Sequence, residues 1–377
     1  MIYLDHAATT PVPRAVADAM YEVLTEQFGN PSSQYPMGLE MKRRVEAWRK
    51  TVADALGCGA KQLFFTSCGT EADNWAVTAA CWQNRHLGRH IVTTAVEHSA
   101  VLEACRWMER QGYEVTYLVP AQDGSLSAEQ VLAAVRQDTA LVSCMLVNNE
   151  LGNIYPIAEI ARGLAVKNPQ TLLHTDAVQG FLKVPFSAKA LGADFIAISG
   201  HKVGAPKGIG ALYIGPRVRN PRPLLPGGGQ EMGLRSGTEA TAQIAGFAKA
   251  VELRWDHLED KLRHMAEVKA YAVEKLTAIP DLQIIGSGKA PHVLSVSMAG
   301  WPSQNVVNDL GSQGICVSAG SACHHGKSSQ VVSALGLPKR VAAGVIRLSF
   351  GPETTFAEID ACAEALRNHH DHRMPML

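Results

Sequence analysis

Two short motifs far apart in this chain contain residues that together can move a sulfur atom. Ser199-Gly200-His201-Lys202 follows an apolar, strand-like run, and Ser318-Ala319-Gly320-Ser321-Ala322-Cys323 lies in a stretch of small residues. A lysine at the carboxyl end of a buried strand can form a Schiff base with a cofactor aldehyde. A cysteine on a glycine-containing loop can carry a reactive thiolate to that site. An amine that holds a substrate and a thiol that attacks it would suffice for sulfur transfer.

Each of these two residues also has a plainer interpretation. Lys202 would be an ordinary solvent-facing lysine after a strand, but the apolar run before it and the glycine turn at 206–210 favour a functional role. Cys323 would be a small buried residue, as most free cysteines are. Against that, its loop is polar and glycine-rich and continues into His324-His325, surroundings that suit a reactive thiolate.

Polar residues also follow other predicted strands. Gly69 and Thr70 open a helix whose exposed N–H groups can bind a phosphate, although a plain helix cap explains the same residues. Asp176 can keep a pyridine nitrogen protonated, or cap the following turn. His98 can stack on a flat ring or transfer protons, or lie exposed at the start of a loop.

Three further sites are candidates for binding anions. Asn149 can bind a substrate carboxylate or form an Asx turn. The segment Arg235-Ser236-Gly237-Thr238 can hold an anion or form a surface turn. Arg347 lies inside an apolar strand, where an unpaired guanidinium is rarely tolerated. We therefore expect Arg347 to meet a carboxylate, either a structural one or that of an amino-acid substrate.

Alternating helical and β-branched segments must position these residues. The sequence predicts helices at 14–28, 39–56, 71–84, 101–110 and 128–136, and strands at 62–66, 90–94, 114–118, 141–147, 172–175, 195–199 and 211–214. This alternation predicts an α/β fold with a largely parallel sheet covered on both faces. Ligands of such sheets lie at the carboxyl ends of the strands, where most of the polar motifs fall.

The last third of the chain predicts a second unit. A loop rich in proline and glycine at 221–229 precedes one long helix, 241–278, which we expect to bridge two domains. Strands at 293–297, 315–317 and 345–349 and helices at 303–310 and 356–367 then form a compact α+β unit. We expect a large domain over 15–255 and a small domain built from 1–14 and 256–377.

Composition excludes several classes of protein. The 377 residues include 35 basic and 35 acidic side chains, so no charge attracts the chain to nucleic acid or acidic membranes. The longest apolar runs have strand length, and the N-terminus lacks the pattern of a secretory signal. The eight cysteines are scattered without a C-x-x-C pair, which predicts no metal site and a reducing cytoplasm. His369, His370 and His372 are more typical of a solvated terminus than of a metal site.

The ordered set of motifs resembles the cysteine desulfurases of the NifS/IscS type, in the class V branch of the PLP-dependent aminotransferases. The resemblance runs nearly end to end and rests on these motifs: Tyr3-Leu4-Asp5-His6-Ala7-Ala8-Thr9-Thr10-Pro11, Gly29-Asn30-Pro31-Ser32-Ser33, Thr70-Glu71-Ala72-Asp73-Asn74, Glu97-His98, Asn148-Asn149-Glu150-Leu151-Gly152, Asp176-Ala177-Val178-Gln179, Ser199-Gly200-His201-Lys202, Arg235-Ser236-Gly237-Thr238, Gly320-Ser321-Ala322-Cys323 and Arg347-Leu348-Ser349. It implies fold type I, that of aspartate aminotransferase: a mostly parallel seven-stranded sheet in the large domain and a small α+β domain.

The resemblance also implies a role for each matching position. Lys202 would carry pyridoxal 5′-phosphate (PLP) covalently, His98 would stack over its ring and assist proton transfer, and Cys323 would accept the sulfur. Asp176 would pair with the ring nitrogen and Gln179 with the ring oxygen. The phosphate would be held by Gly69, Thr70, Ser199 and His201, with Thr238 reaching in from the second subunit of a homodimer. The substrate carboxylate would be held by Asn149 and Arg347, with Asn30 nearby.

The activity so implied is the removal of sulfur from L-cysteine, which yields L-alanine and a persulfide on Cys323. A sulfur-acceptor or scaffold protein would be the partner, in iron–sulfur cluster assembly or tRNA thiolation, with no direct contact to nucleic acid or membrane. Selenocysteine lyase and other PLP-dependent β-lyases share the same machinery and remain alternatives. A catalytically silent scaffold-binding subunit is the alternative outside enzymes.

Three positions depart from the family pattern. Cys68 stands beside the phosphate loop where a small residue is usual, and Tyr35 replaces a histidine. The segment from Cys323 to Gly336 is slightly shorter than in the housekeeping branch of the family. A shorter arm would reach fewer acceptors, so these departures bear on the identity of the partner protein.

Overall fold

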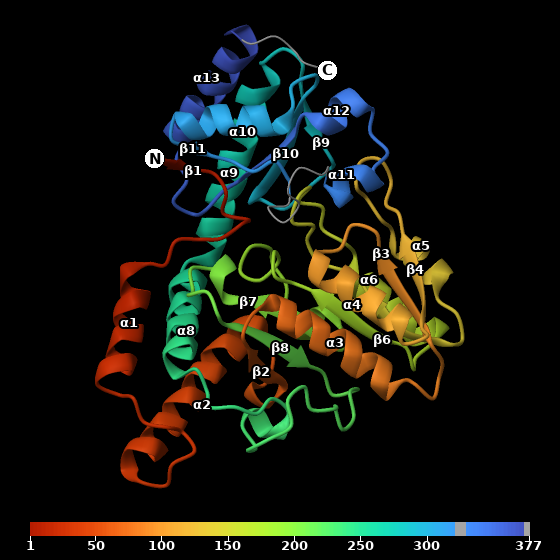
Figure 1. Ribbon diagram of the computed structural model, residues 1–377, viewed down its shortest axis with the longest axis vertical. Coiled ribbons are helices and arrows are strands. Elements are labelled where there is room, and N and C mark those ends of the chain that lie inside the picture. The colour runs from red at the N-terminus through yellow and green to blue at the C-terminus, as the bar shows by residue number, and fades with distance from the viewer. Residues whose placement is uncertain (321–328, 373–377) are drawn as a thin grey trace.

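The computed structural model describes residues 1–320 and 329–372. Its centre is a seven-stranded sheet in the order β2-β8-β7-β6-β5-β3-β4 (Figure 1). Only β8 runs against its neighbours, which confirms the predicted, mostly parallel sheet. Its strands are β2 (Leu63–Thr66), β3 (His90–Thr94), β4 (Glu114–Leu118), β5 (Thr139–Ser143), β6 (Leu172–Asp176), β7 (Phe195–Ser199) and β8 (Gly210–Ile214).

Strand β7 shows why the sheet is covered on both faces. All five of its residues are buried, and alternate side chains enter different cores. Phe195 and Ala197 pack with α3 and α4, whereas Ile196 and Ile198 pack with residues of α2, α6 and α8. A strand that is apolar throughout is therefore satisfied only between two layers of helices.

The helices of this part are α1 (Arg14–Thr25), α2 (Pro36–Leu56), α3 (Gly69–Gln83), α4 (Ser99–Arg110), α5 (Ala128–Ala134), α6 (Ile157–Lys167), α7 (Ala188–Leu191) and α8 (Thr241–Trp255). No helix among the described residues has both the length and the apolar character needed to cross a membrane.

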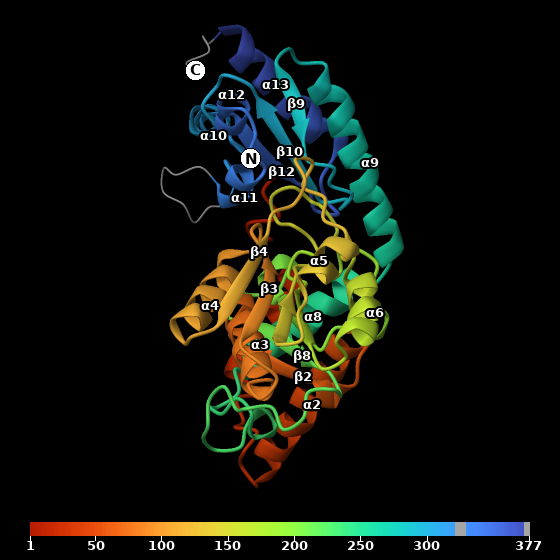
Figure 2. The ribbon, with the colours of Figure 1, turned by 90° about the vertical axis from the view of Figure 1, so that its right-hand side faces the viewer.

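A smaller α+β unit lies beyond the carboxyl edge of the main sheet (Figure 2). It contains a three-stranded antiparallel sheet, β12-β10-β9, and a short parallel pair between β1 and β11. Its elements are β1 (Ile2–Tyr3), α9 (Leu258–Thr277), β9 (Leu282–Ile285), β10 (Val293–Met298), α10 (Ser303–Ser312), β11 (Ile315–Cys316), α11 (Gln330–Ala334), α12 (Lys339–Ala343), β12 (Val345–Ser349) and α13 (Phe356–His372). The N-terminal strand thus pairs with a segment more than 300 residues away.

The prediction of one continuous helix over 241–278 was wrong. The chain forms two helices, because Asp256 has an extended ψ of 125° and His257 a left-handed φ of 50°. No glycine or proline marks this break in the sequence. The two helices instead serve different cores: Phe247 packs under the main sheet, whereas Val268 packs in the small unit.

The sequence pattern also misplaced or missed other elements. Strand β5 ends at Ser143, four residues before the predicted end. Helix α6 and strand β9 were not predicted. The histidine-rich tail continues α13, and His369 is buried there, with its Nδ1 2.8 Å from Asp309 Oδ2.

A buried ion pair anchors the loop that carries Arg235 and Thr238. Glu231 accepts hydrogen bonds from Arg49 Nη1 at 2.7 Å, Arg49 Nη2 at 2.9 Å and the backbone N–H of Phe65 at 2.9 Å. Both charged side chains are almost fully buried, 4% and 3% exposed. Removing one partner would leave the other charge buried without compensation.

We therefore expect Glu231→Gln to lower the free energy of unfolding by about 3 kcal/mol. Denaturation midpoints in urea measure this loss. Glu46→Gln is the matched control, because Glu46 contacts the same arginine at 3.3 Å but is 58% exposed. Equal losses in the two variants would contradict the assignment of the stability to the buried pair.

Candidate active site

A cavity of about 290 Å³ opens at the carboxyl edge of the main sheet, below the small unit. The edge collects the segments that follow β2, β3, β5, β6 and β7, because parallel strands end on the same side. Most of the predicted site residues line this cavity: Gly69, Thr70, His98, Asn149, Asp176, Gln179, Ser199, His201, Lys202 and Arg347.

Lys202 is held by the N-terminal segment of the chain. It ends the short 3-10 helix η2 (Gly200–Lys202), and its Nζ donates to the carbonyl oxygens of Ala7 and Ala8, both at 2.7 Å. Thr10 fixes this segment against η2, since its hydroxyl donates to the carbonyl of His201 at 2.8 Å. Reasoning from residue types missed Ala7 and Ala8, because backbone carbonyls leave no mark in a sequence.

One end of the cavity is suited to an anion. Helix α3 begins at Gly69, and the hydroxyl of Ser199 is buried without a hydrogen-bond partner among the described residues. A Cβ added at Gly69 would lie 2.9 Å from Val178 Cγ2, so only glycine permits the backbone to pass this close. Burial lowers the pKa of His201 to about 4, so its imidazole is neutral at pH 7.

Two acidic residues also line the cavity. Asp176 accepts a hydrogen bond from Val178 N at 2.8 Å, and burial raises the pKa of its carboxyl. Asp73 also lines the cavity, and burial, with Asp176 next, raises its pKa well above the usual value. Sequence reasoning missed Asp73, although a carboxylate one turn after Thr70 on a buried helix was an available signal. A cation bound here would offset the cost of these buried charges.

His98 presents one ring nitrogen to the cavity in a defined state. Its Nδ1 accepts a hydrogen bond from the N–H of Ala100 at 3.1 Å, so the neutral ring carries its proton on Nε2. Burial lowers the pKa of His98, while Asp176 opposes that shift. The imidazole is therefore neutral at pH 7, with Nε2 as its proton-bearing atom.

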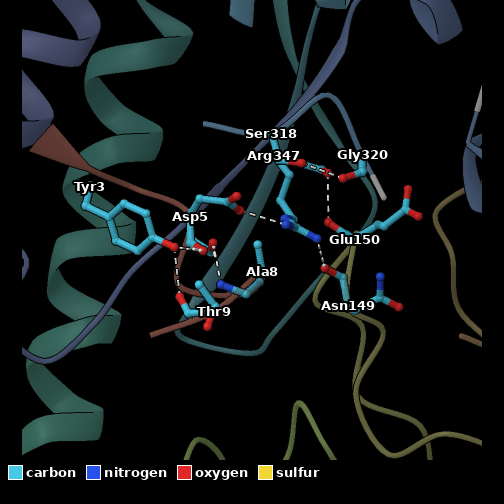
Figure 3. Close-up of polar contacts among 12 residues, drawn as sticks. Tyr3, Asp5, Ala8, Thr9, Asn149, Glu150, Ser318, Gly320 and Arg347 are labelled. Carbon is cyan, nitrogen blue, oxygen red and sulfur yellow. Dashed lines mark hydrogen bonds and ion pairs between the residues drawn. The ribbon is translucent and has the colours of Figure 1, made fainter. Parts of the chain in front are cut away.

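Arg347 belongs to strand β12 of the small unit and lines the cavity, with Asp5 and Asn149 beside it (Figure 3). Its Nη2 donates to Asp5 Oδ1 at 2.7 Å and its Nη1 to the carbonyl of Asn149 at 2.9 Å. The expected carboxylate partner is thus present and belongs to the N-terminal motif. Arg347 Nε is a buried donor without a hydrogen-bond partner among the described residues, so it can bind a substrate carboxylate, whereas the equally unpaired Asn149 Oδ1 is an acceptor and suits a substrate donor.

The structure does not bring two of the predicted residues to this cavity, and it does not describe a third. Thr238 and Asn30 are exposed, and Asn30 Oδ1 accepts the N–H of Ser32 at 2.9 Å in a turn between α1 and α2. Cys323 lies outside the described residues. Cys68, which departs from the family pattern, does line the cavity.

The residues present fit PLP. The start of α3 and the unpaired Ser199 hydroxyl match a phosphate, and Asp176 with Asp73 matches a protonated ring nitrogen. Lys202 supplies an amine from the carboxyl end of a buried strand, on the same cavity. These residues thus offer hydrogen-bond donors for the phosphate, carboxylates for the ring nitrogen and an amine for the aldehyde.

Comparison with known protein families agrees with this geometry. Residues 2–362 match the family model described as aminotransferase class-V. The chain is 40% identical over 369 residues to the cysteine desulfurase IscS of Methanosarcina thermophila, covering 97% of this chain and 91% of that protein. It is 42% identical over 371 residues to a cysteine desulfurase of a Nostoc strain, covering 97% and 92% of the two chains.

Solved structures show the same similarity. A NifS-like protein superposes with a TM-score of 0.92 at 36% identity, over 99% of this chain and 100% of that chain. SspA, solved in complex with cysteine, superposes with a TM-score of 0.81 at 32% identity, over 94% and 100% of the two chains.

Proposed function

The chain belongs to the aminotransferase class-V family, and from that premise we infer that it is a PLP-dependent cysteine desulfurase. Its reaction removes the sulfur of L-cysteine and yields L-alanine. The observation that carries this inference is the single cavity that combines Lys202, Asp176 and His98 with the free donors of Arg347. When bound, PLP supplies an electron-withdrawing ring that stabilises negative charge at the substrate Cα.

We propose that Lys202 both binds the cofactor and moves the Cα proton. Its Nζ already lies on the cavity wall, held by two backbone carbonyls. Lys202 would hold the cofactor, and its amine, when it is not bound to the cofactor, would accept the proton from the substrate Cα. Asp176 would hold the ring nitrogen protonated, and Gly69, Thr70, Ser199 and His201 would hold the phosphate.

The substrate carboxylate would bind between Asn149 and Arg347. The guanidinium keeps Nε free of a described partner while Asp5 and the Asn149 carbonyl fix its two Nη groups. A guanidinium held in this way offers a charged donor without the loss of side-chain freedom on binding. Asp5 is therefore a structural partner that orients Arg347 toward the cavity.

Cys323 would be the sulfur acceptor. Its thiolate attacks the sulfur of L-cysteine, so that an S–S bond forms while the Cβ–S bond of the substrate breaks. The electron pair of the broken bond would remain with the substrate Cβ, which takes up a proton, and Lys202 would return the proton to Cα, so that L-alanine leaves. The enzyme then carries a persulfide on Cys323 for transfer to an acceptor in iron–sulfur cluster assembly or tRNA thiolation.

We also propose a cytoplasmic homodimer. Thr238 is exposed, and its loop is anchored by the Arg49–Glu231 pair, so it is available to a neighbouring subunit. The proposed division into a large domain, 15–255, and a small domain, 1–14 and 256–377, agrees with the separate sheets.

One experiment tests the function directly. The purified protein with PLP is scanned for absorbance with and without L-cysteine, and alanine and sulfide are measured in the same samples. We expect a bound-PLP spectrum that changes on addition of cysteine, with alanine and sulfide formed in equal amounts in the presence of a reducing thiol. A colourless protein, or alanine without sulfide, would rule the proposal out.

The state of His98 predicts the acid limb of the pH profile. Because burial lowers its pKa below the usual 6.5, the neutral ring is retained until the pH falls through that lowered value. If the reaction requires the neutral ring with its proton on Nε2, kcat/KM falls only below pH 6.5, where the ring becomes an imidazolium. We expect His98→Gln to lower kcat/KM by about 10²-fold and to remove this limb. A limb that persists unchanged in the variant would assign the titration to another group.

A further inference from the structure

Lys183 is a buried lysine that the proposed reaction does not use. It is 1% exposed, and the charged groups that act on it are Lys202, Arg254 and Arg347, all cations. Burial, followed by these cations, lowers its pKa well below the usual value. Burying an amine among cations costs free energy of desolvation and repulsion. An apolar side chain would be expected at this position unless the amine has a function.

The amine of Lys183 points at one atom of the cofactor cavity wall. Its Nζ donates to Gln179 Oε1 at 2.9 Å, and Nε2 of the fully buried His292 lies 3.3 Å from the same oxygen. On its other side, Gln179 donates from Nε2 to the carbonyl of Ala7 at 2.9 Å. That carbonyl also accepts from Lys202 Nζ, so a chain of contacts joins Lys183 to the catalytic amine.

An amide needs such contacts to keep one orientation. The oxygen and nitrogen ends of Gln179 have nearly the same shape, so packing alone does not distinguish them, whereas hydrogen bonds do. An amine donor against Oε1 and a carbonyl acceptor against Nε2 both favour the observed orientation. In the flipped orientation, two acceptors would meet at Ala7, and Lys183 would face a donor in place of the acceptor Oε1.

We propose that Lys183 is a positioning residue for the cofactor site. It holds the Gln179 amide in the orientation in which Nε2 faces Ala7 and the cavity. This inference rests on the proposed function, which assigns Gln179 to the ring oxygen of PLP. An N–H directed at that oxygen favours its deprotonated form. Without Lys183 the Gln179 amide would also populate the flipped orientation. Its oxygen would then face the ring oxygen of PLP and disfavour the deprotonated form of that oxygen.

The test follows the absorbance of bound PLP as the pH is raised. The midpoint of this spectral change reports the protonation of the cofactor, not the rate of the reaction. We expect Lys183→Met to raise the midpoint by about 0.5 to 1 pH unit. Lys183→Leu carries the same expectation and replaces the first variant if that variant is insoluble.

Two controls separate the hydrogen bond from charge and packing. Lys183→Gln removes the charge but keeps an N–H donor, so its midpoint should stay close to the wild-type value. Lys269→Met removes another mostly buried lysine, one that donates to the carbonyls of Gly288 and Ala290 rather than to Gln179, and should leave the midpoint unchanged. Lys269 also acts on the charge of His292, so its variant tests whether a buried cation near His292 shifts the midpoint without a contact to Gln179. The other groups near Lys183 and His292, which are His6, Arg254, Arg347 and Lys202, are unaltered in all variants.

A double-mutant cycle completes the test. In a Gln179→Leu background, Lys183→Met should cause no further shift, because the amide through which it acts is absent. The proposal is overturned if Lys183→Met leaves the midpoint unchanged, or if Lys183→Gln or Lys269→Met shifts the midpoint as much as Lys183→Met does. It is also overturned if the shifts caused by Lys183→Met and by Gln179→Leu add in the double variant. Failure of the proposed function itself is seen separately, as wild-type protein that binds no PLP or forms no sulfide.

Discussion

Lys202→Ala is expected to lower kcat for alanine formation by at least about 10³-fold, because one side chain is assigned both to hold PLP and to accept the Cα proton. The structure supports this double role by its position. The amine lies on the cavity wall with two backbone carbonyls at 2.7 Å, close to His98 and Asp176 on the same cavity. No other lysine lines the cavity within the described residues.

The measurement combines kinetics with retention of the cofactor. The variant should still take up PLP, because the proposed phosphate site and Asp176 are intact, but dialysis should remove it, since the covalent link is missing. Lys207→Ala is the matched control: this lysine is exposed five residues later and should leave both readouts unchanged. A variant that retains PLP through dialysis and forms alanine normally would refute the assignment.

Cys323→Ser is expected to reduce the release of sulfide by at least about 10³-fold while the spectrum of bound PLP survives. A serine hydroxyl is far less nucleophilic toward sulfur than a thiolate at neutral pH, so the S–S bond does not form. We assign cofactor binding to residues of the described cavity and sulfur acceptance to Cys323. The variant thus separates cofactor chemistry from sulfur transfer.

The comparison requires a second thiol variant. Cys316→Ser removes a half-buried cysteine from strand β11, seven residues earlier, and should keep sulfide production near that of the wild type. Trapping with a thiol-alkylating reagent after one turnover should label a persulfide in wild type and in Cys316→Ser, but not in Cys323→Ser. Undiminished sulfide production by Cys323→Ser would move the acceptor role to another thiol, with Cys68 on the cavity wall as the first to test.

The polar residues of the site could be predicted because each follows a strand with a strong local pattern. Strand β7 is apolar at four consecutive positions before Ser199, and β6 is buried throughout before its last residue, Asp176. Parallel strands end at one edge, so Lys202, Asp176 and His98 had to lie near one another once the sheet was recognised. The need of Arg347 for a carboxylate followed in the same way from its apolar strand.

The sequence by itself therefore determined the α/β class and the family, and it predicted the chemistry of the cavity, because continuous apolar runs and ordered motifs are local properties. Only the tertiary structure decided which distant groups contact the site residues. Asp5 contacts Arg347, the carbonyls of Ala7 and Ala8 contact Lys202, and Lys183 contacts Gln179. The break between α8 and α9 belongs to the same class, since it arises where two cores compete for one run of residues. The physical reason is that such contacts join segments up to about 340 residues apart, and no local propensity records a partner supplied by another part of the chain.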